Sequence, residues 1–362
     1  IIKNLKRGNE LNIVVTYSSF QTSKFRKIFN YDLKDFIVIF DEAHNMGALG
    51  FMNNNKRIEF NKRIGLSATP LRDWDDEGSN DFIYNFFNIS SPTFEFKMED
   101  AIGKFLCEYN YYPHFSELDE EEWNEYKYWT SKLFIHADDK KINTTAALKR
   151  QQIIDKTNSK ISTLKEIVDK LILENNLKHT LIYCPKGGDE ENEMRIIHKI
   201  GKIINDNFKG KINGQFFLGE TKDRELLIED FTDGHVDFLY AIKCLDEGVN
   251  IPVTKNAIFI ASGKNKREYI QRRGRVLRKH KNKKYSNIFD IIVLPSIATY
   301  KKDENMSVNL IKNEFSRILE FINISKNSID AIDSIDKKLN QYNLSFNQIK
   351  YIIEEDEKKS FT

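Results

Sequence analysis

Two adjacent carboxylates and a histidine follow an apolar run in FIVIFDEAHN, residues 36–45. The run predicts a buried strand of a parallel sheet, because apolar residues continue without polar alternation. Carboxylates at the carboxyl end of such a strand point into the crevice where α/β sheets bind ligands. There Asp41 can orient a hydrated magnesium ion, and Glu42 can take a proton from an attacking water. A structural role, in which the acids end the strand and cap a helix, is the alternative for so short a motif.

Small polar residues and a glycine end two other predicted strands. Ser67 and Thr69 in LSATP follow the next strand along the chain, where their hydroxyls can bridge neighbouring strand ends. AIKCLDEGVNIP, residues 241–252, ends a later strand in a loop. Gly248 in that loop lets the backbone approach a ligand closely.

Two arginines are spaced to act together in QRRGRVLR, residues 271–278. Arg275 and Arg278 are three residues apart and share one face of a predicted helix. Because arginine does not lose its charge, such a pair suits the stabilisation of a transferring phosphoryl group.

Strand-like and helix-like segments alternate, which predicts an α/β protein with parallel sheets covered on both faces. The predicted strands are 12–17, 36–42, 63–69, 179–184, 214–219, 236–242, 256–262 and 287–294, and the helices include 146–174, 190–207, 222–231 and 266–273.

The spacing of these segments predicts two sheet domains. Residues 1–90 form the first and 176–300 the second, with a linking or inserted region at 91–175 and a helical tail at 301–362 that packs on the second domain. YNYYPHF (109–115) and Trp123 with Trp129 can stack on bases, but we favour a small core that packs this region against the first domain.

Composition excludes several classes of protein. The chain has 362 residues, is 40% hydrophobic, and has no apolar run near the ~18 residues of a membrane span and no secretion leader. Its three cysteines, Cys107, Cys184 and Cys244, have no metal-ligand spacing and favour a reducing cytoplasm.

Charge is unevenly distributed although the net charge is only +2. Residues 255–284 hold twelve Lys or Arg and one acid, whereas ELDEEE at 117–122 is acidic. One face for polyanions and solvated loops of opposite sign are both consistent with this pattern.

The motifs resemble an ordered family set. DEAH, SAT, LIYC, LDEGVNIP and QRRGRVLR resemble motifs II to VI of superfamily 2 helicases and translocases, and IVVTYSSF (13–20) is similar to motif Ib. The resemblance covers about residues 10–297 and is nearest to restriction-enzyme motor subunits and excision-repair helicases. It implies two RecA-like domains with ATP bound between them.

The resemblance also implies roles for individual residues. Asp41 would hold magnesium through water, Glu42 would be the general base, and His44 would sense the γ-phosphate side. Ser67 and Thr69 would couple hydrolysis to nucleic-acid grip. The remaining assignments are arginine fingers at Arg275 and Arg278 with Gln271 beside them, a ribose-side residue at Asn250 where many members carry Asp, and phosphate-backbone contacts at Thr16, Thr221 and Lys243. Ordinary loop polarity is the alternative for the last three.

The phosphate-cradling loop of this family, GxxxxGK[ST], does not occur in the sequence. ASGKNK (261–266) lacks the first glycine and the final hydroxyl residue, and CPKGGDEE (184–191) lacks the lysine. Because only forty residues precede Asp41 and the chain begins with Ile, we expect a fragment that alone hydrolyses ATP poorly or not at all.

These observations predict an ATP-dependent helicase or translocase that acts on double-stranded DNA in preference to RNA. Other domains or subunits would determine where it acts. A catalytically inactive nucleic-acid-binding scaffold is the alternative. Metal-dependent nuclease chemistry is disfavoured, because no further acids or histidines with metal-ligand spacing accompany Asp41 and Glu42. A role in defence against foreign DNA follows only by analogy with the restriction motors.

Overall fold

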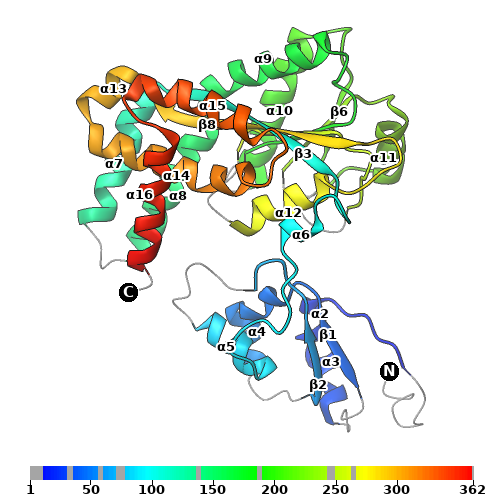
Figure 1. Ribbon diagram of the computed structural model, residues 1–362. Helices are drawn as coiled ribbons and strands as arrows, with labels where there is room; N and C mark the ends of the chain where they lie inside the picture. The colour runs from blue at the N-terminus through cyan, green and yellow to red at the C-terminus, as the bar shows by residue number, and fades with distance from the viewer. Residues whose placement is uncertain are drawn as a thin grey trace. The chain divides into compact units, whose positions relative to one another are not determined.

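The structure is a computed structural model that describes residues 11–30, 36–55, 60–70, 78–135, 140–185, 190–242, 249–261 and 266–360. The chain forms two compact units, residues 1–96 and 97–362. Both units contain parallel strands and helices (Figure 1), which confirms the predicted α/β class. None of the described helices combines the length and the apolar character needed to cross a membrane.

The first unit contains a two-stranded parallel sheet in its described part, with Ile37 opposite Lys62. The predicted strand at 12–17 is wrong: residues 11–16 have no regular structure, and Thr16 caps the helix that follows. The elements are α2 (Tyr17–Phe20), α3 (Ser23–Arg26), η1 (Lys27–Asn30), β1 (Ile37–Phe40), η2 (Ala43–Gly47), α4 (Leu49–Asn55), β2 (Lys62–Gly65) and α5 (Ser79–Phe87).

An aromatic core fixes the end of β1. The ring of Phe40 lies 5.3 Å from that of Phe86 and 5.9 Å from that of Phe20, both in edge-to-face geometry. Gly65, at the end of β2, has no room for a side chain, because a Cβ would lie 2.7 Å from a ring carbon of Phe87. The residues that precede the acid pair and the SAT motif therefore meet in one packed core.

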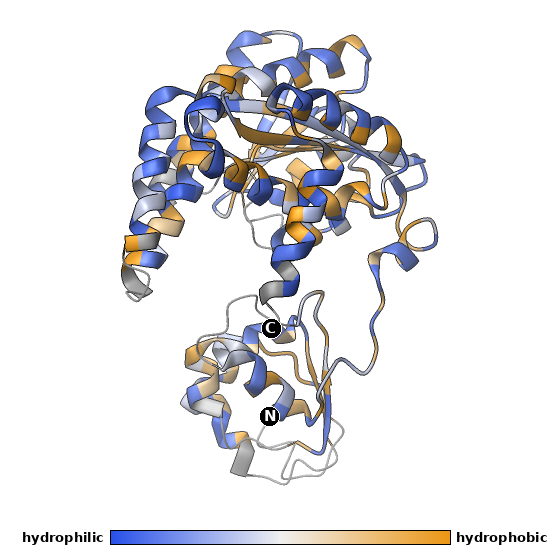
Figure 2. Cartoon of the chain, turned by 60° about the vertical axis from the view of Figure 1, so that its left-hand side comes forward, coloured by the Kyte–Doolittle hydropathy of each residue, from blue (hydrophilic) through white to orange (hydrophobic). Residues whose placement is uncertain are grey.

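The second unit is built on a six-stranded parallel sheet in the order β3-β8-β7-β4-β6-β5. Every residue of its central strands is buried, as expected for a sheet covered on both faces, and the strands are accordingly apolar in Figure 2. The strands are β3 (Glu108–Leu118), β4 (Thr180–Tyr183), β5 (Gly214–Phe217), β6 (Phe238–Ala241), β7 (Asn256–Phe259) and β8 (Tyr285–Pro295).

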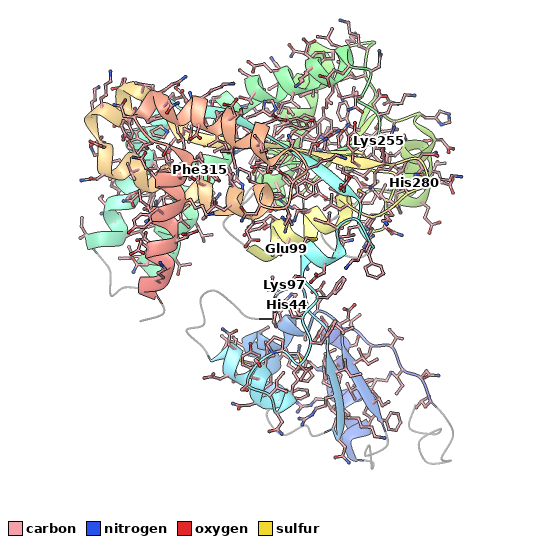
Figure 3. The ribbon with its side chains drawn as sticks, viewed as in Figure 1. His44, Lys97, Glu99, Lys255, His280 and Phe315 are labelled. Atoms are coloured by element: carbon pink, nitrogen blue, oxygen red, sulfur yellow. The ribbon has the colours of Figure 1, made fainter. Side chains whose placement is uncertain are left out.

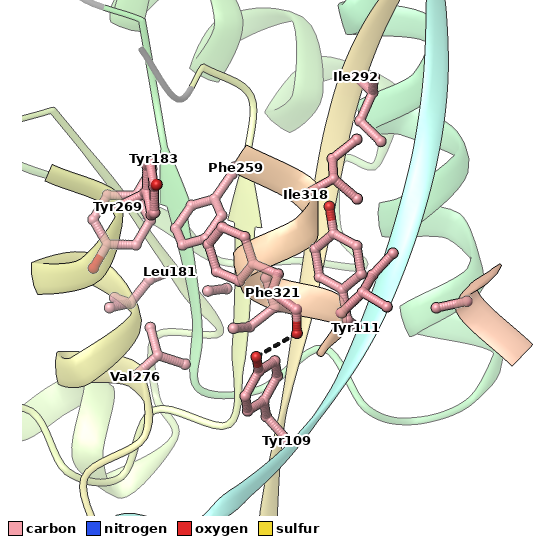
Figure 4. Packing of buried hydrophobic residues seen from close by; sticks show 14 of the residues in the cluster. Tyr109, Tyr111, Leu181, Tyr183, Phe259, Tyr269, Val276, Ile292, Ile318 and Phe321 are labelled. Carbon is pink, nitrogen blue, oxygen red and sulfur yellow. Dashed lines mark hydrogen bonds between the residues drawn. The ribbon is translucent and has the colours of Figure 1, made fainter. Parts of the chain in front are cut away.

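Successive residues of each strand contribute to cores on opposite faces of this sheet. Leu181 packs in a core with Phe259 and Phe321 (Figure 4), whereas Ile182 packs on the other face with α9 and α10. The helices are α6 (Met98–Ala101), α7 (Glu120–Ile135), α8 (Lys140–Lys156), α9 (Ser159–Leu173), α10 (Glu190–Asn207), α11 (Arg224–Asp233), α12 (Lys266–Val276), α13 (Ile297–Lys302), α14 (Glu304–Ile322), α15 (Ser328–Leu339), η3 (Asn340–Tyr342) and α16 (Phe346–Ser360).

The segment predicted as a linking region at 91–175 instead supplies an edge strand. β3 pairs with β8 along its whole length, from Glu108 opposite Tyr285 to Leu118 opposite Pro295. Its polar residues and Pro113 hide the strand pattern in the sequence, and proline is tolerated in a strand at the edge of a sheet. Tyr109 and Tyr111 point into the core, where Tyr109 donates a hydrogen bond to the carbonyl of Phe321 (Figure 4).

The aromatic residues after β3 also belong to the second unit. Trp123 and Tyr126 of α7 are buried in a cluster with Val293 and Leu310, and their rings stack with centroids 5.6 Å apart. The prediction that this region packs on the first domain is therefore wrong. These rings complete a core between α7, α8, β8 and α14.

A buried ionic cluster joins the helical tail to the sheet. Both oxygens of Asp290 on β8 accept from the guanidinium of Arg317 on α14, at 3.0 and 3.1 Å. Tyr111 donates to the same carboxylate at 2.8 Å, and Arg317 also lies 3.4 Å from Glu314. Since Asp290 is completely buried, its charge depends on this pairing.

Replacing Arg317 by methionine is expected to lower the free energy of unfolding by about 3–5 kcal/mol, because Asp290 would keep a buried charge without its partner. Lys326→Met, which removes an exposed pair with Glu108, is the control and should cost about 1 kcal/mol or less. Urea denaturation followed by circular dichroism measures both. Equal losses would contradict the assignment of Arg317 as the central cation.

Stability should also fall in mild acid because of His114 on β3. Burial, and then the charge of Lys170, lowers the pKa of His114 to about 4. Below about pH 6.5 His114 is protonated in the unfolded chain, whereas in the folded chain it stays neutral until about pH 4. The free energy of unfolding is therefore highest above about pH 6.5 and falls as the pH is lowered toward 4. The loss is up to about 3 kcal/mol and should be smaller in His114→Phe. An identical pH profile for that variant, measured beside His235→Asn, would exclude His114.

Candidate nucleotide-hydrolysis and coupling site

The chain turns sharply where β1 ends at the acid pair. Glu42 has a φ of 48°, a left-handed conformation that side chains other than Gly, Asn and Asp seldom adopt. The amide of Glu42 donates to Oδ1 of Asp41 at 3.0 Å, and the amide of Ala43 donates to the carbonyl of Leu66 at 2.8 Å. Such strained turns persist where surrounding structure fixes them, and they concentrate at functional sites.

His44 links the acid pair to the SAT motif. Its ring is buried, and its Nδ1 lies 2.9 Å from Oγ of Ser67 and 3.3 Å from a carboxylate oxygen of Glu42. Oγ of Ser67 also accepts from the amide of Thr69 at 3.2 Å. Hydrogen bonds thus join His44, Ser67 and Thr69, and the carboxylate of Glu42 lies beside His44 at ion-pair distance.

Tyr17 positions this turn, and the sequence reasoning assigned it no role. Its hydroxyl donates to the carbonyl of Asp41 at 2.8 Å, and its ring lies 5.6 Å from that of Phe51. Burial, followed by the negative charges of Asp41 and Glu42, raises the pKa of Tyr17. The available signal was its place in IVVTYSSF, the segment that resembles motif Ib.

Tyr17→Phe is expected to destabilise the first unit by about 1 kcal/mol, because the carbonyl of Asp41 loses its donor while the aromatic packing is kept. Tyr84→Phe on α5 is the matched control. Native-state hydrogen exchange of amides in residues 37–47 measures the local effect. Unchanged protection there would show that the hydroxyl does not hold the turn.

The second unit places its two candidate arginines on one carbonyl. Nη1 of Arg275 donates to the carbonyl of Val249 at 2.7 Å, and Nη1 of Arg278 donates to the same oxygen at 3.2 Å. Arg278 also donates to Oδ1 of Asn250 at 2.5 Å. Burial and the neighbouring charge of Arg275 lower the pKa of Arg278. Gln271 lies one turn before Arg275 on the same helix, α12.

Two of the residues predicted to contact nucleic acid form hydrogen bonds with nearby backbone amides. Thr16 caps α2 by accepting from the amide of Ser19 at 3.1 Å, and Thr221 accepts from the amide of Leu218 at 2.7 Å. These bonds agree with the alternative of ordinary loop polarity without testing a contact to phosphate. Lys243 and Gly248 lie outside the described residues.

Part of the basic stretch 255–284 is structural. Arg272 and Arg273 are 1% and 2% exposed, and Arg273 donates to the carbonyl of Glu320 at 2.6 Å. Lys283 is also buried and donates to the carbonyls of Thr254 and Val276, and burial lowers its pKa to about 8. These three cations donate to backbone carbonyls inside the second unit and do not form a face for polyanions.

The side chains at the end of β1 include the kind of oxygen donor that binds magnesium in nucleotide sites. Magnesium in nucleotide sites is held by one or two carboxylates together with water and phosphate oxygens. Asp41 is exposed at the strand end, and its Oδ1 already accepts from a backbone amide, which fixes the carboxylate's direction. No group of three or more potential metal ligands occurs within the described ranges.

Comparison with known families agrees with the resemblance of the motifs to those of helicases and translocases. The helicase conserved C-terminal domain family matches residues 159–280, and the DEAD_2 family matches residues 6–62. These matches support a superfamily 2 helicase or translocase.

Two curated relatives are each 25% identical to the chain. One is the protein designated helicase 22 of the Sulfolobus islandicus filamentous virus, aligned over 88% of this chain and 54% of its own length. The other is the DNA 3'-5' translocase XPB2 of Sulfurisphaera tokodaii, aligned over 67% of this chain and 56% of its own length. The chain thus spans a little over half the length of these relatives.

A solved structure is also similar. The helicase domain of Hef from Pyrococcus furiosus matches with a TM-score of 0.44 and 14% identity, covering 78% of this chain and 77% of that one.

Proposed function

We propose that the chain is part of an ATP-dependent translocase that moves on double-stranded DNA. The observation that carries the proposal is the connection from Glu42 through His44 to Ser67, which joins the ends of two neighbouring parallel strands. Through this connection, a change at Glu42, which would activate the water, can move together with the SAT loop that follows the next strand.

In this proposal, Asp41 orients magnesium through a water molecule and Glu42 takes the proton of the attacking water. Bound magnesium–ATP would supply the phosphoanhydride bond that is cleaved. His44 holds the carboxylate of Glu42 from the side of Ser67. Arg275 and Arg278 offer permanent charge for the phosphates, after release of the carbonyl of Val249.

DNA is the proposed track because one curated relative bears the name of a DNA translocase. The choice of double-stranded DNA rests on the resemblance of the motifs to restriction-enzyme motor subunits. Backbone contacts carry little sequence information, so further domains or subunits would choose the site of action. Steady-state phosphate release with duplex DNA, single-stranded RNA or no nucleic acid tests this assignment. Stronger stimulation by RNA than by the duplex would overturn it.

The 362 residues contain no GxxxxGK[ST] segment, so we propose that this chain alone hydrolyses ATP slowly. The same phosphate-release assay tests the proposal on the chain by itself. Rapid release that duplex DNA stimulates and Glu42→Gln removes would show that another element cradles the phosphates.

A nucleic-acid-binding scaffold without hydrolysis is the second candidate, and the absent loop is the observation that favours it. The two candidates differ in a protein that carries a phosphate-binding loop joined to this chain. The translocase proposal predicts DNA-stimulated hydrolysis there, whereas a scaffold predicts DNA binding without phosphate release.

A further inference from the structure

Lysines gather along one edge of the six-stranded sheet, at the amino ends of its strands. Because all six strands are parallel, the residues that precede them lie side by side at this edge in the sheet order. Lys284 directly precedes β8, Lys255 precedes β7, and Lys178 and His179 precede β4. We define the amino-end edge by six lysines: Lys178, Lys209, Lys211, Lys255, Lys281 and Lys284.

Contacts between neighbouring connections hold these residues together. The amide of Lys255 donates to the carbonyl of His179 at 2.9 Å, and the amide of Asn287 donates to the carbonyl of Lys255 at 2.8 Å. Burial lowers the pKa of His179, and the charges of Lys255, Lys178 and His280 lower it further, so the four groups are close enough to interact. Figure 3 shows Lys255 and His280 near one another at the same end of the sheet.

Among the described residues, no acid pairs with the lysines of this edge. Five of the six lysines are exposed and Lys255 is half-buried. In the part of the chain that the structure describes, no ion pair joins any of them to an acid. The nearby acids have other partners: Asp237 accepts from the amide of Asn213 at 2.7 Å, and Asp230 faces His235 at 3.4 Å.

Helix dipoles explain only part of this arrangement. Lys209 and Lys211 come two and four residues after the carboxyl end of α10, where a positive charge is favourable. Lys178 comes five residues after the end of α9, Lys281 and Lys284 come five and eight residues after the end of α12, and Lys255 follows the loop at 249–254. Because the effect of the dipole falls off within the last turn of a helix, a purely structural role leaves four of the six lysines unexplained.

We propose that the amino-end edge binds the phosphate backbone of nucleic acid, at a surface separate from the strand-end motifs at the opposite edge of the same sheet. The row from β8 to β5 crosses five strands and is roughly 19 Å long. A strand of B-DNA presents a phosphate about every 3.4 Å along the axis, so point charges spread along this edge suit it. Lysines precede β8, β7, β4 and β5, and Asp237 precedes β6 between them. An acidic protein is less suitable, because carboxylate recognition favours the planar fork of arginine, and the row is made of lysine.

The test compares two triple variants of the full chain with the same change in charge. The edge variant carries Lys178→Gln, Lys255→Gln and Lys284→Gln. The control carries Lys199→Gln, Lys202→Gln and Lys301→Gln, at exposed lysines of α10 and α13 away from this edge. Binding of a fluorescein-labelled 25-base-pair duplex is followed by anisotropy between 50 and 200 mM salt.

The edge variant is expected to bind more weakly, and its slope of log affinity against log salt should be smaller by about 0.9 for each phosphate that the variant no longer neutralises. The control should keep the slope of the unaltered chain. Arginine at the three edge positions should also keep it, since the charge is retained and a folding defect would not be rescued by charge alone.

Three outcomes would overturn the proposal. Equal changes in the two variants would show a net-charge effect. An unchanged slope in the edge variant would show that the lysines of the amino-end edge do not contact phosphate. Displacement of the duplex by poly-glutamate as effectively as by unlabelled duplex would indicate an acidic protein partner. An edge variant that binds like the unaltered chain overturns only this inference, whereas a chain without any affinity for duplex also overturns the proposed function.

Discussion

Replacing Glu42 by glutamine is expected to lower DNA-stimulated ATP hydrolysis by about a hundredfold to ten-thousandfold, with nucleotide binding retained. Glutamine has the same shape but cannot accept a proton, so it removes a general base from an otherwise intact site. The turn should survive, because its bonds run through the amide of Glu42, the carbonyl of Asp41 and the amide of Ala43. The experiment requires a form of the protein that hydrolyses ATP.

Glu121→Gln on α7 is the control, since this glutamate is exposed in the second unit. Phosphate release gives kcat and KM, and a fluorescent ATP analogue gives the nucleotide affinity. Unchanged hydrolysis would remove Glu42 from the role of base. Loss of nucleotide affinity together with hydrolysis would make Glu42 a residue that shapes the site, as its left-handed backbone also allows.

Hydrophobic periodicity was sufficient to predict the helices and strands that are buried on one face or completely. The helix predicted at 190–207 begins and ends at those residues, and the central strands β4, β6 and β7 lie within their predicted apolar runs. β3 was missed because its outward residues are polar and it contains Pro113, which is compatible only with an edge position that the sequence does not reveal. Residues 12–17 are apolar enough for a strand, but Val14 is fully exposed and Thr16 starts a helix.

The parts of the site that could be predicted are those in which residues with catalytic side chains lie at the ends of strands. Asp41, Glu42 and Ser67 lie at the carboxyl ends of predicted strands, and parallel pairing brings those ends together. Tyr17 was not predictable, because its bond to Asp41 joins residues 24 positions apart through the packing of aromatic rings. Composition also could not show that Arg272 and Arg273 are buried while Lys281 and Lys284 are exposed, since all four belong to one basic stretch.

Alanine at Arg275 or Arg278 is expected to lower kcat by about a thousandfold or more, the effect of removing an arginine that stabilises a transferring phosphoryl group. Lysine at either position should restore little, since an ammonium cannot reproduce the planar fork. Asn250→Asp should give a smaller loss, because the new carboxylate would bind the guanidinium of Arg278 that now donates to the amide oxygen.

The arginines also hold the carbonyl of Val249, so a loss of activity must be separated from a loss of structure. Thermal unfolding of each variant provides that separation, with Arg273→Ala as the contrasting case: Arg273 is buried against Phe321 and its loss should lower the midpoint strongly. Variants of Arg275 and Arg278 should unfold within a few degrees of the unaltered protein while kcat falls. If their midpoints fall as far as that of Arg273→Ala, or if only KM rises, the two arginines position a loop and a ligand but do not stabilise the transferring phosphate.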